Sequence, residues 1–68
     1  MSNELPFKIY AVSDDMDLVA AFAWASEAKE CAMRLSGDCS GEIFRVELSS
    51  DGRWIDFKDG VEIGRRDW

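Results

Sequence analysis

The feature that most constrains the fold is a pair of Asp-Gly dipeptides, Asp51-Gly52 and Asp59-Gly60, each set between segments of alternating polar and apolar residues. Such a dipeptide between alternating segments is a strong signal for a β-hairpin, because tight hairpin turns need residues that tolerate a positive φ. Residues 42–63 are therefore predicted to form consecutive antiparallel strands. Their apolar positions, which fall on a common side, are Phe44, Val46, Leu48, Ile55 and Phe57.

The turn lengths decide how these strands pair. A two-residue turn at Asp51-Gly52 would set Leu48 opposite Ile55 and Val46 opposite Phe57, so that the apolar faces coincide. This register would also set Glu47 opposite Asp56 and Arg45 opposite Lys58, which is mildly unfavourable. The diagonal pairs, Arg45 with Asp56 and Glu47 with Lys58, are opposite in sign and partly offset it.

The second hairpin calls for a different turn. A two-residue loop at Asp59-Gly60 would set Phe57 against Glu62 and spoil the apolar face. A three-residue loop at 58–60, with Gly60 left-handed, pairs Phe57 with Val61 and Ile55 with Ile63, so a bulged hairpin is expected.

The N-terminal half begins with a predicted strand at 7–12, which is rich in β-branched and aromatic residues. One face of this strand would carry Phe7, Ile9 and Ala11, and the other Lys8, Tyr10 and Val12. Residues 17–25 are alanine-rich and apolar all round, which leaves two interpretations. One is a single long helix over 14–36. The other, which we favour, is a second strand at about 18–23, paired with the first, and a helix at about 25–36 that ends with Gly37 in the C′ position.

These elements give one α+β domain over residues 1–68. Its core is an antiparallel sheet of three to four strands with one helix packed on one face, in the order ββαββ or βαβββ. The C-terminal segment 65–68 is expected to fray.

The chemistry of the chain disfavours an enzyme. Its 68 residues include no histidine, so it lacks the imidazole that most often serves as a general base or metal ligand. The five glycines are scattered and form no phosphate-binding loop. The two cysteines, Cys31 and Cys39, do not form a CxxC pair, and two are too few for a disulfide scaffold. We expect no catalytic site, no metal and no cofactor.

The net charge of −6 limits the partners. Direct nucleic-acid binding and binding to an anionic membrane are both disfavoured, because each depends on lysine and arginine side chains. No apolar run approaches the length of a membrane span. A basic protein partner is favoured, including a protein groove that normally holds nucleic acid.

The candidate binding residues are carboxylates and one tryptophan. Three aspartates lie in the turn between the first two predicted strands, two glutamates lie on the polar side of the predicted helix, and Trp54 lies on the sheet face away from Ile55 and Phe57. The carboxylates also suit an ordinary solvated turn and helix surface, and Trp54 suits simple cover of the sheet. The candidates are Asp14, Asp15, Asp17, Glu27, Glu30 and Trp54.

Three segments, 23–32, 41–47 and 52–60, resemble a layout found in small phage-encoded proteins. In these a strand leads into a short S-x-A-K-x-x-A helix, here Ser26 to Ala32, and then into a hairpin with G-x-W and K-D-G, here Gly52 to Trp54 and Lys58 to Gly60. Over residues 20–63 the chain is similar in this order to some type I anti-CRISPR proteins. The resemblance implies a non-enzymatic inhibitor that docks on the basic surface of a CRISPR surveillance complex, and it transfers no site residue.

Two hypotheses follow. The first is a small acidic inhibitor that docks on a basic surface of a nucleic-acid-binding complex. The second is a generic protein-interaction module or a homodimeric structural protein that adds its sheet edge or tryptophan face to a copy of itself. In both the protein is expected in the cytoplasm, the host cytoplasm if a phage encodes it.

Overall fold

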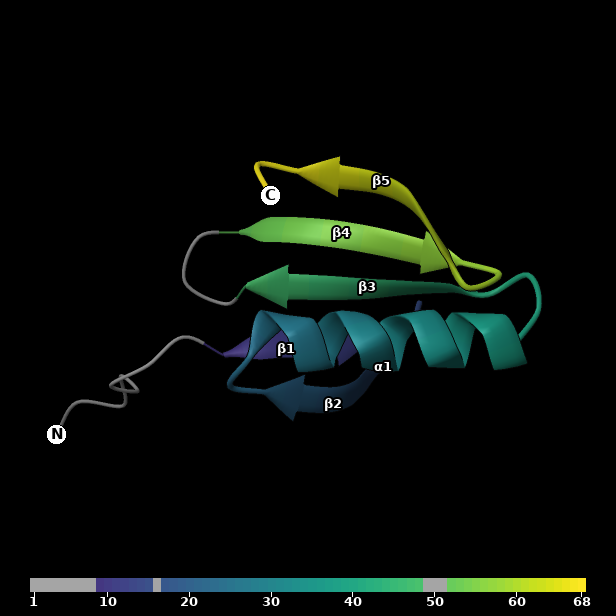
Figure 1. The fold of residues 1–68 in the computed structure, drawn as a ribbon, viewed down its shortest axis with the longest axis horizontal. Helices are drawn as coiled ribbons and strands as arrows, with labels where there is room; N and C mark the ends of the chain where they lie inside the picture. The colour runs from purple at the N-terminus through teal and green to yellow at the C-terminus, as the bar shows by residue number, and fades with distance from the viewer. Residues whose placement is uncertain (1–8, 16, 49–51) are drawn as a thin grey trace, which may run out of the picture.

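A computed structural model describes residues 9–15, 17–48 and 52–68. Over these residues one α-helix and five β-strands follow one another in the order ββαβββ (Figure 1). The elements are β1 Tyr10–Ser13, β2 Leu18–Phe22, α1 Ala25–Asp38, β3 Ile43–Leu48, β4 Arg53–Lys58 and β5 Val61–Arg66. The predicted α+β class and single helix are confirmed, whereas the predicted three to four strands were too few.

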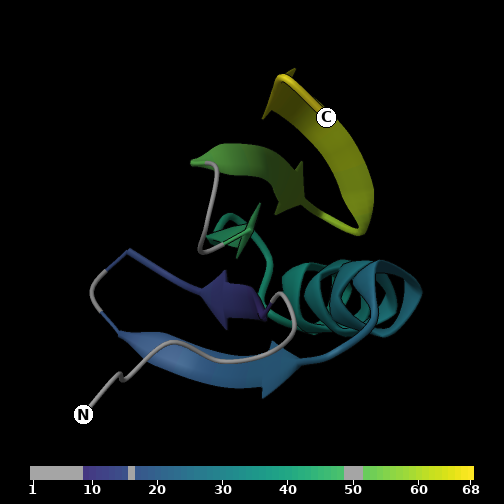
Figure 2. The same cartoon turned by 90° about the vertical axis from the view of Figure 1, so that its left-hand side faces the viewer.

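The strands form one antiparallel sheet in the order β2-β1-β3-β4-β5. The sheet curves around α1, which covers one of its faces (Figure 2). An N-terminal hairpin, β1 with β2, and a C-terminal meander, β3 to β5, meet where β1 pairs with β3. The first strand was predicted from Phe7, and residues 7 and 8 lie outside the described residues.

The ambiguous alanine-rich segment is a strand over Leu18–Phe22, as we favoured, and the helix begins at Ala25. The helix turns small residues toward the sheet, because Ala28, Ala32 and Ser36 are buried. Small side chains at these spacings let the helix axis approach the sheet closely, so the larger strand residues fill the core. The strand residues buried in the hydrophobic core are Val12, Phe44, Val46, Ile55 and Phe57.

The helix does not end at Gly37 as predicted; it continues to Asp38, and the N–H of Cys39 bonds to the carbonyl of Leu35 at 2.9 Å. A tertiary contact holds these two additional residues. The buried Ser36 hydroxyl donates to the carbonyl of Met33 at 3.1 Å and accepts the Gly60 N–H at 3.0 Å. The last turn of α1 is thereby tied to the β4–β5 turn.

The predicted register of β3 and β4 was wrong by two residues, although the inward and outward faces were right. Val46 lies opposite Ile55, and Arg45 lies opposite Asp56. The connection is longer than two residues, and it includes residues 49–51, which lie outside the described part. The longer connection replaces the unfavourable Glu47–Asp56 pair by an ion pair between Arg45 and Asp56.

The predicted three-residue loop between β4 and β5 was also wrong. Lys58 pairs with Val61 across a two-residue turn in which Asp59 and Gly60 have φ of 53° and 82°. Positive φ at both positions is the geometry that Asp-Gly favours in a hairpin. Glu62 then lies opposite Phe57. The expected bulge occurs further along the ladder, where the register shifts between the Phe57–Glu62 pair and the Asp56–Gly64 pair.

The C-terminal segment does not fray. Arg65 and Arg66 belong to β5, and Trp68 packs against the core, with its ring centroid 5.7 Å from that of Tyr10. Lys29 of the helix lies over the same indole ring at 5.4 Å. Trp68 therefore closes the end of the core between the helix and β1.

Among the described residues, no helix combines the length and the apolar character that crossing a membrane requires.

Candidate functional site

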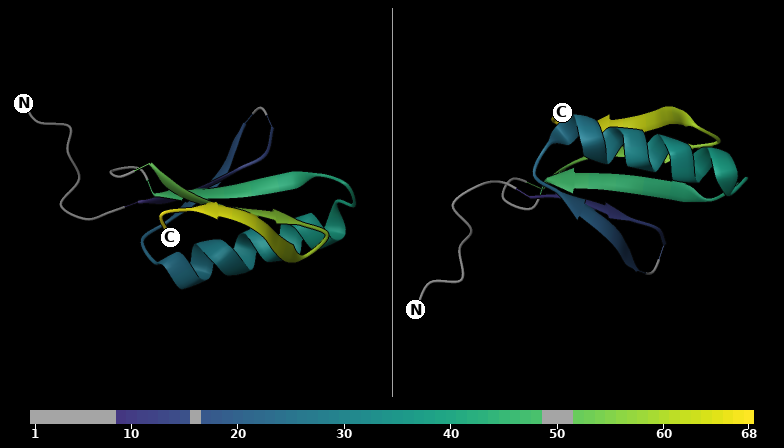
Figure 3. Two further views of the ribbon diagram at one scale, coloured as in Figure 1. Left: turned by 90° about the horizontal axis from the view of Figure 1, so that it is seen from above. Right: turned by 60° about the horizontal axis from the view of Figure 1, so that its bottom comes forward.

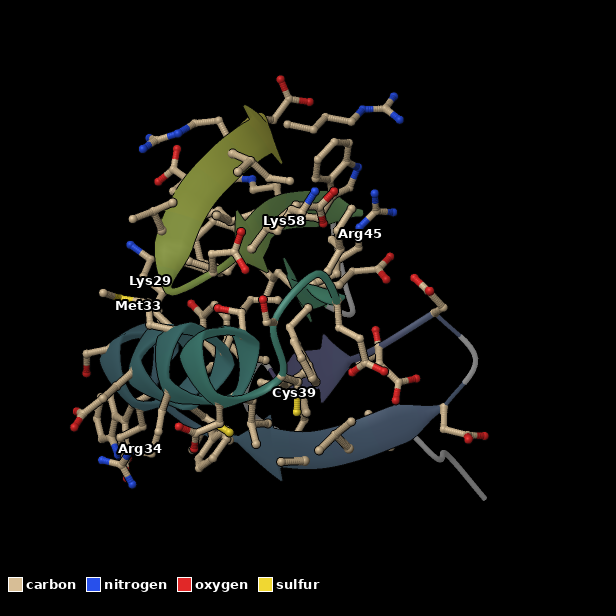
Figure 4. The ribbon with its side chains drawn as sticks, turned by 90° about the vertical axis from the view of Figure 1, so that its right-hand side faces the viewer. Lys29, Met33, Arg34, Cys39, Arg45 and Lys58 are labelled. Carbon is tan, nitrogen blue, oxygen red and sulfur yellow. The ribbon has the colours of Figure 1, made fainter. Side chains whose placement is uncertain are left out.

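The face of the sheet opposite α1 carries mostly polar residues, which alternate along the strands with the buried core residues. Because side chains alternate along a strand, the residues between the buried ones in β3 and β4 point to this face. Figure 4 shows Arg45 on this side and Arg34 on the helix side. We call this surface the open face. Its β3 and β4 members are Ile43, Arg45, Glu47, Trp54, Asp56 and Lys58.

Arg45 is the centre of the open face. Its guanidinium donates two hydrogen bonds to the Asp56 carboxylate, at 2.7 and 3.1 Å, and its Cζ lies 4.0 Å from the centre of the Trp54 ring. The hydrogen bond to Asp56 raises the pKa of Arg45 and outweighs the partial burial that opposes it, while the charges of Asp56 and Glu47 add to the rise. A planar cation held between a carboxylate and an aromatic ring is fixed in orientation.

The acidic turn between β1 and β2 rises from the sheet on the side away from α1 (Figure 3). Asp14 shapes this turn, because its carboxylate accepts the N–H of Asp17 at 2.8 Å and its own N–H donates to the carbonyl of Asp17 at 3.0 Å. Such a local bond is the usual role of an aspartate in a tight turn. Asp15 and Asp17 are exposed.

A hollow of about 370 Å³ lies between this turn and β3. We call it the acidic hollow, because four carboxylates and one guanidinium line it. Within the described residues, Asp15 and Glu47 make no salt bridge or side-chain hydrogen bond, whereas Asp56 is held by Arg45. The hollow therefore carries an excess of negative charge. Its lining residues are Ser13, Asp14, Asp15, Ile43, Arg45, Glu47 and Asp56.

The structure separates the predicted site residues into two surfaces. Asp14 and Asp15 line the acidic hollow, and Trp54 lies beside it on Arg45, so these three share the open face. Asp17 belongs to the same turn but does not line the hollow. Trp54 was correctly predicted to point away from Ile55.

The two predicted helix residues lie elsewhere. Glu27 and Glu30 line a second hollow of about 340 Å³ on the helix side, together with Phe22, Cys31, Arg34 and Leu35. Glu30 accepts a hydrogen bond from Arg34 at 3.3 Å, and both side chains are largely exposed. These glutamates therefore do not act together with the acidic turn.

Sequence reasoning treated Arg45, Glu47 and Asp56 as cross-strand charges and did not identify them as site residues. The alternation of β3 and β4 placed them on the outer face, but the hollow also depends on β1, where Ser13 pairs with Arg45. The opposite charges of Arg45 and Asp56 could have indicated the correct register. Shifting the predicted register of β3 and β4 by two residues makes these two residues direct cross-strand neighbours.

The site offers ionic and aromatic contacts. In the described part of the chain, no group of three or more histidine, cysteine, aspartate or glutamate side chains is placed to hold a metal ion. Comparison with protein-family models, with curated proteins and with solved structures gave no match to this chain.

Proposed function

We propose that this protein is a non-enzymatic binding protein whose open face docks on a basic surface of another protein. The observation that supports this most directly is the acidic hollow, in which the carboxylates of Asp14, Asp15, Glu47 and Asp56 surround the single guanidinium of Arg45. A hollow of about 370 Å³ has room for the end of a lysine or arginine side chain. The partner's cation would offset the excess of carboxylates in the hollow.

The surroundings of the hollow suit a docking surface. Trp54 is half-buried on the same face, and tryptophan is enriched among the residues that contribute most to protein interfaces. Arg45 holds the indole in place, so little side-chain freedom would be lost on binding. The net charge of −6 would speed the approach to a basic partner and make binding weaken as salt is added.

The partner class that we propose is a complex that binds nucleic acid. Such a complex carries a groove lined with lysine and arginine, in which carboxylates can take the place of phosphates. The resemblance to type I anti-CRISPR proteins points to the same class and makes a CRISPR surveillance complex the first candidate. In this function the protein is an inhibitor that competes with DNA.

The test compares two double variants that change the charge equally. Asp15→Lys/Glu47→Lys alters the acidic hollow, and Glu27→Lys/Glu30→Lys alters the helix side. Asp14 is kept because it shapes the turn. Each protein is titrated against a purified type I surveillance complex, and against proteins retained from a host lysate at low salt, over a range of salt concentrations.

We expect the hollow variant to lose affinity at least tenfold more than the helix variant, and wild-type affinity to fall steadily with salt. Circular dichroism of both variants establishes that the fold is intact. Equal losses in the two variants would mean that net charge alone matters, and salt-independent binding would contradict docking on a basic surface.

A further inference from the structure

A row of three neighbouring side chains crosses the open face from β3 to β5. Glu47 lies opposite Trp54, and Trp54 lies opposite Arg66. Residues directly opposite each other in an antiparallel pair point to the same face of the sheet. Because Trp54 belongs to the open face, Glu47 and Arg66 flank it there. The row, which we call the charge row, therefore runs from a negative charge through an aromatic ring to a positive charge.

The two ends of the charge row lie in surroundings of opposite sign. Neighbouring strands are about 4.8 Å apart, so the backbones of Glu47 and Arg66 are about 10 Å apart. Beyond Glu47 lies the acidic hollow. At the other end Arg66 is exposed, and Lys58 of β4 lies half-buried on the same face. The open face thus has an acidic part and a smaller basic part, with Trp54 at their border.

The tryptophan at this border has a defined position. Arg45 lies over the indole, with its Cζ 4.0 Å from the ring centre. On the β5 side, the Cζ3 atom of the ring lies 3.9 Å from the point that a Cβ at Gly64 would occupy. Because Gly64 has no side chain, it adds nothing that would cover this edge of the indole. A partner can therefore contact Trp54 between the two charged ends of the row.

We propose that the charge row recognises a protein surface with the opposite order of charges. A lysine or arginine of the partner faces the acidic hollow, a carboxylate faces Arg66, and an apolar patch between them receives Trp54. This inference rests on the proposed function and specifies its partner, because it places docking where the basic surface borders an acidic residue. Complementary charges of this kind fix the orientation of a complex and reject other partners.

The shape of the sheet supports this placement. The sheet curves around α1, so the open face is its convex side (Figure 2). A convex face fits a concave surface, whose two walls then meet the two ends of the charge row. A groove with lysine and arginine on both walls would bring positive charge against Arg66, and such a like-charge contact is unfavourable. A groove with one basic wall and a carboxylate on the other matches both ends.

The experiment uses the sign of the response to added negative charge. Arg66→Glu on the open face and Arg34→Glu on the helix side alter the net charge equally, and both arginines are exposed (Figure 4). Each variant is titrated against the purified type I surveillance complex and against poly-L-lysine, which carries positive charge alone. We expect Arg66→Glu to bind the complex about tenfold more weakly than wild type, because it repels the partner's carboxylate. We expect Arg34→Glu to bind the complex at least as tightly as wild type.

Two controls separate recognition from damage to the protein. Both glutamate variants should bind poly-L-lysine more tightly than wild type, since this polymer has no carboxylate to repel. Arg66→Lys preserves the charge at the end of the row and should bind the complex with wild-type affinity. Circular dichroism establishes that each variant is folded.

The outcomes distinguish this inference from the function on which it rests. If Arg66→Glu binds the complex as tightly as Arg34→Glu does, the charge row has no role, and docking through the acidic hollow still stands. If Arg66→Glu binds poly-L-lysine more weakly than wild type, repulsion of a carboxylate is also ruled out. If wild type does not bind the complex, or if Asp15→Lys/Glu47→Lys binds it unchanged, the proposed function falls and this inference falls with it.

Discussion

The covered face and the open face of the sheet are made from alternate residues of the same strands, yet their chemistry is opposite. On the covered face Phe44 and Phe57 are each 3% exposed. One residue away along the same strands, Arg45 and Asp56 form an ion pair on the open face. Because side chains alternate along a strand, one set of residues stabilises the fold and the other set is available for contact with a partner.

The sharpest test of this division is Phe57→Ala on the covered face. Removing a buried phenylalanine leaves a cavity, so we expect a loss of about 3–5 kcal/mol in the free energy of unfolding. That loss is comparable with the whole stability of a domain this small. Urea denaturation followed by tryptophan fluorescence measures it, and a loss below about 1 kcal/mol would show that Phe57 does not anchor the core.

A smaller effect is expected at the junction of helix and hairpin. Ser36→Ala leaves the Gly60 N–H without its acceptor, so we expect a loss of about 1–3 kcal/mol. Ser26→Ala, at an exposed position of the same helix, is the matched control and should change the free energy of unfolding by less than about 0.5 kcal/mol. Equal losses in the two variants would mean that the hydrogen bond to Gly60 contributes nothing.

The open face should tolerate change with little loss of stability. Asp56→Asn removes the charge that holds Arg45, and we expect a loss of about 0.5–1 kcal/mol because the arginine is partly exposed and screened by solvent. The loss should shrink as salt is added, which thermal denaturation at two salt concentrations would reveal. A loss as large as that of Phe57→Ala would break the division between the two faces.

The smallest expected effect concerns the exposed ion pair on β5. The hydrogen bond from Arg65 lowers the pKa of Glu62. A carboxyl group with a lowered pKa contributes stability that is present above its ordinary pKa and is lost as the pH falls through the lowered value. Carboxyl titration by NMR should show Glu62 titrating below an ordinary glutamate, and Arg65→Gln should return it toward the ordinary value.

Much of the fold was predictable because alternation and turn chemistry are local. The strand at Leu18–Phe22, the helix start at Ala25 and the inward face of Phe57 all followed from short-range pattern. Turn lengths did not. At Asp51-Gly52 the two-residue turn and the observed register both align the apolar faces, so the alternation could not choose between them. At the second hairpin the preference of the turn and the alignment of the apolar faces conflict. At Asp59-Gly60 the turn preference prevailed, since Glu62 opposite Phe57 can still reach Arg65 on an exposed strand.

The candidate site was less predictable than the fold. The acidic turn and Trp54 were identified from the sequence, but the hollow between them requires Ser13 to pair with Arg45 across the sheet. That pairing joins distant parts of the chain, and no local pattern encodes it. The helix residues Glu27 and Glu30 were grouped with the turn because sequence alone does not show which side of the sheet a helix covers.

The pairing of β1 with β3 also has a kinetic consequence. It is the one strand ladder, among the described residues, that joins the N-terminal hairpin to the C-terminal meander, and it brings Tyr10 beside Leu48. Closing so long a loop costs entropy before any contact compensates for it, whereas each hairpin closes a short loop. The N-terminal hairpin and the C-terminal meander should therefore form early. The pairing of β1 with β3, which joins them, should limit the rate at which the domain folds.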